Sequence, residues 1–263
     1  MTTETILTQI DERGLATLTM NRSELHNAFD DLFIAALTTE LRRLEADDSV
    51  RVVILAASGR SFSAGADLSW MRRMADYTRE ENLADALGLA ELMRTLSGLG
   101  KPTIAAVQGA AYGGGVGLVA CCDVAIASRR ATFCLSEVKL GLIPAVISPY
   151  VVEAMGPRAA RRYFQSAEVF DAAEAHRLGL VHEVTAEEEL PAAVERLAAA
   201  LLANGPHAMT AAKALVARVA SGPIDGAMIR DTAERIAAAR ASAEGKEGLS
   251  AFLEKRKPRW VKG

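Results

Sequence analysis

The segment from Pro102 to Cys122 carries no charged side chain over 21 residues and contains five glycines. A stretch of this length is long enough to cross a lipid bilayer. The glycines, together with Gln108, would interrupt a helix and leave main-chain groups without hydrogen bonds in lipid, so a membrane span is disfavoured. The segment instead predicts a buried strand, a glycine-rich loop and a buried helix in succession.

The same order of elements recurs along the first two thirds of the chain. Continuous apolar runs are typical of strands covered on both faces, alternating runs are typical of a hairpin, and an apolar residue every three or four positions indicates a helix. The apolar runs are 52–57, 103–107 and 123–128, the hairpin is 6–20, and the helices are about 30–45 and 80–99. After residue 187 the chain is rich in alanine with helical periodicity. These patterns predict a mixed α/β core followed by helices that serve as a lid or an oligomer interface.

Composition excludes several classes of protein. Thirty Lys and Arg against thirty-three Asp and Glu give a net charge of −3, which disfavours nucleic acid as the main partner. The N-terminus is acidic and polar where a signal peptide needs a basic start and an apolar core, so we expect a cytoplasmic protein. Cys121, Cys122 and Cys134 form neither a disulfide framework nor a metal-binding pair, so we expect no metal.

Two glycine-containing segments follow buried strands, and each is expected to open a helix. They are residues 60–71 (RSFSAGADLSWM) and 108–123 (QGAAYGGGVGLVACCD). Free N–H groups at a helix start attract negative charge, and two such donors that converge on one point form an oxyanion hole. Taken alone, the first segment is equally consistent with an ordinary strand-to-helix turn.

Two other motifs fit these segments less well. GRSFS at 59–63 has a serine where a nucleophile elbow requires its second glycine. GVGLVA at 115–120 matches the dinucleotide fingerprint in letters. The expected strand ends at Val107, too far upstream for the tight first turn of that motif. We therefore disfavour both a serine nucleophile and a nicotinamide cofactor.

Glu137 is a candidate for acid–base chemistry. Glu137 and Lys139 are the only charged residues between Ala131 and Val152. A carboxyl group in apolar surroundings has a raised pKa, which suits it to exchange protons near neutral pH. The alternative is a surface glutamate paired with Lys139 or with a neighbouring arginine.

Together these segments resemble the enoyl-CoA hydratase/isomerase family, also called the crotonase family. The motifs that carry the resemblance are NRSELHNAF (21–29), FSAGADL (62–68), KPTIAAVQGAAYGGG (101–115), ATFCLSEVKLGLIP (131–144) and FLEKRKPRW (252–260). The resemblance implies the crotonase (ClpP-like) α/β fold, a spiral of ββα units with a C-terminal helical oligomerisation region. It implies a core at 1–200 for acyl-CoA binding and catalysis. It also implies a helical region at 201–263 that builds trimers or hexamers and covers CoA.

The resemblance also implies roles for individual residues. The main-chain N–H groups of Ala66 and Gly114 would hold the oxygen of an acyl-CoA thioester, and Glu137 would handle the proton at Cβ or the attacking water. No cofactor is implied beyond the coenzyme A of the substrate. The residues expected to contact CoA are Leu25, Ala28, Ala64, Asp67, Leu68, Phe252 and Lys255. The last two would often act from a neighbouring subunit, although Phe252 is also consistent with helix packing and Lys255 with a solvated lysine.

Two departures from the family pattern leave the reaction open. Gly117 stands where hydratases with two catalytic glutamates carry the second one, and we expect the missing side chain to leave room for a branched or carboxylated acyl group. Residues 144–152 (PAVISPYVV) resemble the methylglutaconyl-CoA hydratases of leucine degradation. The hypotheses are a hydratase with one acid, a Δ3,Δ2-enoyl-CoA isomerase, and a protein that binds acyl-CoA or RNA without turnover.

Overall fold

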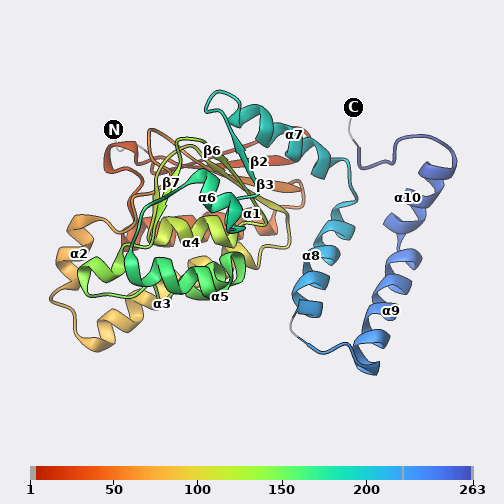
Figure 1. Cartoon of the computed structure of the whole chain (residues 1–263). Helices are drawn as coiled ribbons and strands as arrows, with labels where there is room; N and C mark the ends of the chain where they lie inside the picture. The colour runs from red at the N-terminus through yellow and green to blue at the C-terminus, as the bar shows by residue number, and fades with distance from the viewer. Residues whose placement is uncertain (1–3, 221, 262–263) are drawn as a thin grey trace.

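The computed structural model describes residues 4–220 and 222–261 as a mixed α/β core with a helical arm (Figure 1). The strands are β1 (Ile6–Ile10), β2 (Leu15–Met20), β3 (Val52–Ala57), β4 (Thr103–Val107), β5 (Ala111–Tyr112), β6 (Val124–Ser128), β7 (Thr132–Cys134), β8 (Phe170–Asp171) and β9 (Glu183–Thr185). The α-helices are α1 (Asp31–Ala46), α2 (Leu68–Met74), α3 (Arg79–Ser97), α4 (Gly114–Cys121), α5 (Ser148–Ser166), α6 (Ala172–Arg177), α7 (Leu190–Leu202), α8 (Pro206–Ala220), α9 (Gly226–Ala241) and α10 (Ala243–Leu253). Two 3₁₀ turns, η1 (Ser23–Leu25) and η2 (Glu137–Leu140), complete the fold.

The main sheet has six strands in the order β1-β2-β3-β4-β6-β9. The hairpin expected at 6–20 is confirmed: β1 and β2 pair antiparallel, with Ile6 opposite Met20. The remaining pairs are parallel, with Leu15 beside Val52 in the second pair. A smaller sheet, β5-β7-β8, was not expected, because its strands are two or three residues long and leave no periodic signal.

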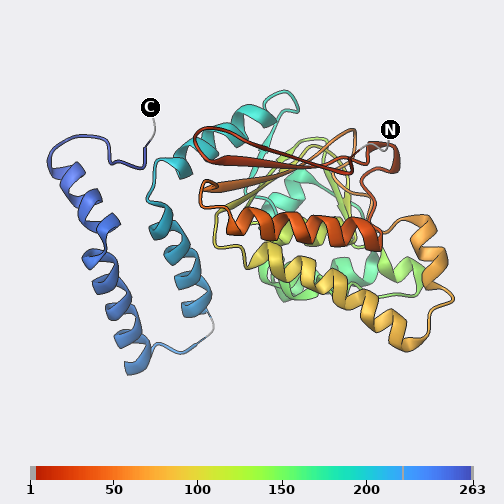
Figure 2. The same ribbon diagram turned by 180° about the vertical axis from the view of Figure 1, so that it is seen from behind.

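Helices cover both faces of the main sheet, which explains why its strands are apolar throughout. On one face, side chains such as Val52 and Ile54 pack against α7, whose buried positions include Leu190, Val194 and Leu202. The opposite face packs on α1, α3 and α4. Figure 2 shows α1 and α3 running side by side beneath the hairpin. The strands and helices expected in this core are confirmed to within a few residues.

The chain after α7 leaves the core as an arm of three helices, α8 to α10 (Figures 1 and 2). Arg51 ties both ends of the arm to the core, because its guanidinium donates to the carbonyls of Asn204 at 2.7 Å and Trp260 at 2.8 Å. Lys213 on α8 also forms an ion pair with Asp123 at 2.9 Å. The arm is therefore anchored at its base, while α9 and the end of α10 lie away from the sheet.

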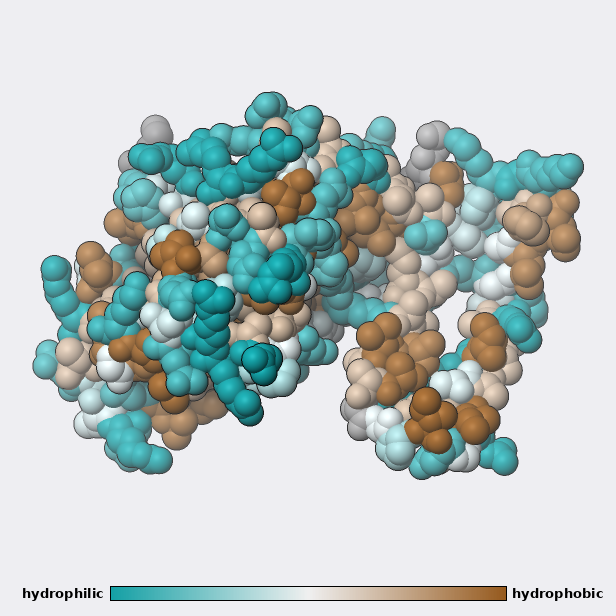
Figure 3. Space-filling view, in the orientation of Figure 1, coloured by the Kyte–Doolittle hydropathy of each residue, from teal (hydrophilic) through white to brown (hydrophobic). Residues whose placement is uncertain are grey.

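The arm exposes many apolar side chains, which Figure 3 shows as brown patches. They are Val216, Val219, Ile224, Ile229, Ile236, Leu249, Phe252 and Leu253. A surface with this many exposed apolar residues is typical of an interface rather than of a monomer in water. In the part of the chain that the structure describes, no helix has the length and apolar character needed to cross a membrane.

Candidate active site

The loop that follows β3 is held in place by Phe29. The main-chain N–H of Phe29 donates to the carbonyl of Gly65 at 2.7 Å, and the N–H of Asp67 donates to the carbonyl of Phe29 at 2.7 Å. Phe29 thus binds the groups on either side of Ala66, so the N–H of Ala66 points away from Phe29. This N–H donates to no group within residues 4–220 and 222–261.

The second loop leads from β5 into α4 and leaves another amide free. Gly113 has a φ of +51°, a conformation that glycine adopts readily and other residues rarely do. Its N–H donates to the carbonyl of Cys134 at 2.9 Å. The next residue, Gly114, is the first of α4, where a helix leaves its N–H groups without intrahelical acceptors. The N–H of Gly114 has no acceptor in the described structure.

Main-chain contacts bring the two loops together. The N–H of Ser63 donates to the carbonyl of Ala110 at 3.0 Å, and the N–H of Tyr112 donates back to the carbonyl of Ser63 at 2.9 Å. A Cβ atom on Gly65 would lie 3.1 Å from the carbonyl oxygen of Tyr112. A Cβ on Gly113 would lie 4.0 Å from the Cα of Gly65. The two residues with free amides follow directly: Ala66 comes after Gly65, and Gly114 comes after Gly113.

Glu137 reaches the same place from η2. Its Oε1 lies 3.3 Å from the position that a Cβ on Gly113 would occupy. Its Oε2 is buried and has no hydrogen-bond partner among the described residues. Burial removes water from the carboxyl group and raises its pKa above the usual glutamate value. No ion pair joins Glu137 to Lys139 or to an arginine in the residues that the structure describes, so the surface-pair alternative is wrong.

Several residues expected to contact CoA lie near the first loop. Ala64 is exposed, as are Leu25 and Leu68, which are 41% and 70% accessible. Asp67 is the N-cap of α2 and accepts hydrogen bonds from the N–H groups at the start of that helix. Ala28 is buried, so its side chain presents little surface to a ligand. Its carbonyl accepts a hydrogen bond from the Arg22 side chain.

The other two expected CoA contacts lie elsewhere. Phe252 is on α10 and Lys255 follows it, at the end of the arm, whereas α2 lies at the opposite end of the molecule (Figure 1). Phe252 is 81% accessible. The structure therefore does not bring Phe252 and Lys255 to the Ala66 loop of the same chain.

The expectation that Gly117 leaves room for an acyl group is wrong. A Cβ on Gly117 would lie 2.3 Å from Cγ2 of Ile147 and 3.1 Å from Cε of Met93. Gly117 is one helical turn after Gly113, whose carbonyl accepts its N–H at 3.3 Å. The Glu137 carboxyl group therefore packs against Gly113, and one turn later the Ile147 side chain packs against Gly117. Ile147 fills the space that a second acid would need.

Sequence reasoning missed the residues that position this site. Asn27 is fully buried, and its side-chain amide donates to the carbonyls of Ser58 and Ser61, both at 2.9 Å. Asn27 lies within the NRSELHNAF motif, but a lone asparagine there carries no signal of burial. Phe29 and Ile147 read in the sequence as ordinary core residues.

Other groups that could carry chemistry are less suitable. The three cysteines are free and buried, and burial raises the pKa of Cys122 to about 12, so a thiolate nucleophile is disfavoured. Arg94 and Arg42 bind Glu91 and lower its pKa to about 2, so Glu91 cannot serve as a proton donor near neutral pH.

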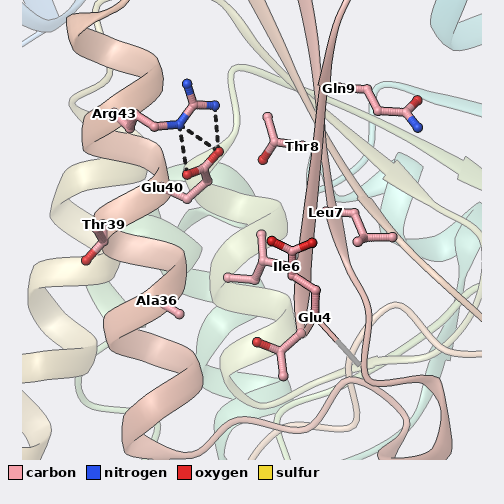
Figure 4. A pocket seen from close by; sticks show the side chains of 10 residues that line it. Glu4, Ile6, Leu7, Thr8, Gln9, Ala36, Thr39, Glu40 and Arg43 are labelled. Carbon is pink, nitrogen blue, oxygen red and sulfur yellow. Dashed lines mark hydrogen bonds and ion pairs between the residues drawn. The ribbon is translucent and has the colours of Figure 1, made fainter. Parts of the chain in front are cut away.

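A groove of about 650 Å³ runs between β1 and α1 (Figure 4). Arg43 and Glu40 face each other at one end of it through an ion pair of 2.7 Å. It contains neither free main-chain amides at a helix start nor Glu137, so we place the chemistry at the two loops.

Comparisons with known proteins identify the family and the fold. The model of the family "Enoyl-CoA hydratase/isomerase" matches residues 11–263. A crotonyl-CoA hydratase from Syntrophomonas wolfei is 35% identical and covers 99% of both chains. A 1,2-epoxyphenylacetyl-CoA isomerase from Escherichia coli is 34% identical over 98% of both. The crystal structure of an enoyl-CoA hydratase from Shewanella pealeana superposes with a TM-score of 0.95 at 48% identity, covering 98% of this chain and 97% of its own. The expected crotonase fold is confirmed.

The Gly117 contact predicts opposite outcomes for two glycine-to-alanine substitutions. Gly117→Ala forces a methyl group into Ile147 and should lower the free energy of unfolding by about 1–3 kcal/mol. Gly88→Ala on α3 meets no atom within 4 Å and should raise it by about 0.5–1 kcal/mol through helix propensity. Urea titration measures both. The Gly117→Ala loss should shrink in an Ile147→Ala background; an unchanged loss would contradict the assigned contact.

The raised pKa of Glu137 predicts a stability gain on neutralising it. Burial disfavours the charged form, so the carboxylate costs stability at pH values above its folded pKa, and this cost vanishes below the ordinary value of 4.5, where both states are protonated. Glu137→Gln should therefore have a higher Tm than the parent at pH 8, and the difference should disappear near pH 4. Thermal unfolding across this range checks it, with Glu153→Gln, at an exposed position, as control. Equal Tm values at pH 8 would contradict the burial argument.

Proposed function

Because this chain belongs to the enoyl-CoA hydratase/isomerase family, we propose that it adds water to the double bond of a 2-enoyl-CoA thioester. The observation that carries the proposal is the buried Glu137 carboxyl group beside two free main-chain amides. A group that exchanges protons and two donors for a developing negative charge are the two requirements of this reaction.

In this proposal the amides of Ala66 and Gly114 hold the thioester oxygen. Attack of water at Cβ moves electrons through the double bond onto that oxygen and makes an enolate. The two N–H donors stabilise this charge, and because the fold holds them in place, little reorganisation is needed as the charge forms. Such donors are worth most when water is excluded from the site.

Glu137 carries out both proton transfers in the proposed reaction. Its carboxylate takes a proton from the water as the C–O bond forms at Cβ. The protonated Glu137 then returns that proton to Cα, the enolate collapses, and the carboxylate is regenerated. One acid is sufficient because the same proton leaves the water and reaches carbon on one side of the substrate, which gives syn addition. A raised pKa suits both halves of this cycle.

Isomerisation of a double bond is the second candidate. The specific observation in its favour is the contact of Ile147 with Gly117, which leaves no room at position 117 for a second carboxyl group beside Glu137. One carboxylate can take a proton from Cα of a 3-enoyl-CoA and return it to Cγ, with the same two amides holding the dienolate. The E. coli relative is named as an isomerase that acts on an epoxide, so the relatives of this chain include isomerases as well as hydratases.

Our proposal for the acyl group of the substrate rests on the sequence alone. Residues 144–152 resemble the methylglutaconyl-CoA hydratases, so 3-methylglutaconyl-CoA is the first branched substrate to test. Gly117 offers no space for a branched acyl group, since Ile147 fills that space. A protein that binds acyl-CoA without turnover remains an outcome of the experiment.

Labelled water distinguishes hydration from isomerisation. Purified protein is mixed with 2-enoyl-CoAs and 3-enoyl-CoAs, including 3-methylglutaconyl-CoA, in oxygen-labelled water, and the products are analysed by mass. Hydration places the label in a 3-hydroxyacyl-CoA, whereas isomerisation gives an unlabelled enoyl product. Glu137→Gln should lower the rate of either reaction by about 10²- to 10⁴-fold, and Glu153→Gln should not. A Glu137→Gln variant with full turnover would contradict the mechanism.

We also propose that the active unit is a trimer, alone or paired as a hexamer, in the cytoplasm. The exposed apolar side chains of the arm support an interface between copies. Phe252 and Lys255 lie far from the Ala66 loop of their own chain, so in this assembly they approach the CoA of a neighbour. There the lysine would face a phosphate group.

Mixed assemblies test whether Lys255 acts across the interface. Lys255→Ala should raise the KM for acyl-CoA, and Glu137→Gln should abolish turnover. When the two variants are refolded or expressed together, some sites combine an intact Glu137 with Lys255 from a Glu137→Gln neighbour. A fraction of the activity should then show the KM of the parent. A mixture that shows only the raised KM would contradict action from a neighbouring subunit.

A further inference from the structure

We propose that Phe29 is a positioning residue that sets the separation of the two amide donors at residues 66 and 114. The inference rests on the proposed role of those donors and adds a residue that touches neither the substrate nor the transferred proton. Phe29 contacts both loops, one through its main chain and the other through its ring.

The main chain of Phe29 controls the first donor. Its N–H and carbonyl bind Gly65 and Asp67, each at 2.7 Å, the residues on either side of Ala66. Two short hydrogen bonds that bracket one residue restrain the orientation of the peptide between them. The direction of the Ala66 N–H is therefore tied to the position of the Phe29 main chain.

The ring of Phe29 controls the second donor. A Cβ on Gly114 would lie 2.6 Å from Cε2 and 2.9 Å from Cδ2 of this ring, so the ring lies directly against the Gly114 main chain. The start of α4 therefore cannot move toward the Phe29 ring without displacing it. Any side chain at position 114 would push the helix start away from Phe29.

The ring is itself held firmly. Phe29 is 1% accessible, and its ring stacks on that of Phe33, with centroids 6.0 Å apart and planes 17° from parallel. Arg22 lies over the Phe33 ring at 5.4 Å and pairs with Asp30 at 2.9 Å. This stack connects the two amides to the start of α1.

The direct contacts between the loops do not replace this function. The Ser63 hydrogen bonds join the loops before the donors are reached, at Ala110 and Tyr112. Phe29 acts at the last residues, where the amides themselves lie. A change of shape at position 29 should thus shift the donors while the loops remain joined.

The experiment compares Phe29→Leu with Phe33→Leu. Both replace a buried ring by the same smaller side chain in one stack, but only Phe29 touches the donor loops. The donors stabilise charge that forms in the transition state, so Phe29→Leu should lower kcat about 10- to 100-fold and change KM little. Phe33→Leu removes one support of the Phe29 ring but none of the contacts of Phe29 with the loops, so its effect should be smaller, with kcat within about threefold of the parent.

A spectroscopic probe measures the donors without turnover. A cinnamoyl-CoA with a para-dialkylamino group absorbs at longer wavelength when its carbonyl oxygen accepts hydrogen bonds, and it is bound to Glu137→Gln protein carrying each substitution. We expect a reduced red shift at saturation for Phe29→Leu and the full shift for Phe33→Leu. Equal shifts for the two variants would overturn the role of Phe29. Absence of a red shift in the Glu137→Gln parent would instead overturn the proposed donor site itself.

Discussion

The site depends on the close approach of two main-chain segments, the loop after β3 and the loop after β5. Ser63 exchanges hydrogen bonds with Ala110 and Tyr112. Beyond it, a Cβ on Gly65 would lie only 3.1 Å from the carbonyl oxygen of Tyr112, and both Gly65 and Gly113 have a positive φ that side chains disfavour. This approach orients the two peptide groups. It also lets the Glu137 carboxyl group pack directly against the main chain of Gly113. The first loop begins at the end of β3 in the main sheet, the second begins at the end of β5 in the smaller sheet, and the glycines allow the two loops to come close together.

The arrangement carries costs that the surrounding core must offset. Oε2 of Glu137 is buried without a partner, and an unsatisfied buried polar group is expensive. His26 and Asn27 both adopt left-handed main-chain conformations, which cost about 1 kcal/mol each for residues with a side chain. Asn27 recovers part of this through hydrogen bonds to the loop after β3. Main-chain strain and a desolvated carboxyl group are both costs typical of a preorganised site.

The sequence was sufficient to predict the core and the desolvation of Glu137, because these follow from local pattern. Strands such as 52–57 are continuous apolar runs, and Glu137 stands in an apolar stretch, so its burial could be anticipated. What occupies the space beside a missing side chain could not be predicted. Gly117 and Ile147 are thirty residues apart in the sequence, and only the packing of α4 on the start of α5 brings them into contact. Asn27 and Phe29 escaped notice for the same reason, since their partners lie on distant loops.

The contact between Gly117 and Ile147 also restricts how this chain could evolve. A glutamate introduced at position 117 alone would meet a branched side chain already in place, so that first step would be selected against before it could confer any advantage. Replacement of Ile147 by a smaller residue must come first. A chain with two acids could therefore arise if the change at Ile147 came before the change at position 117, but not in the reverse order.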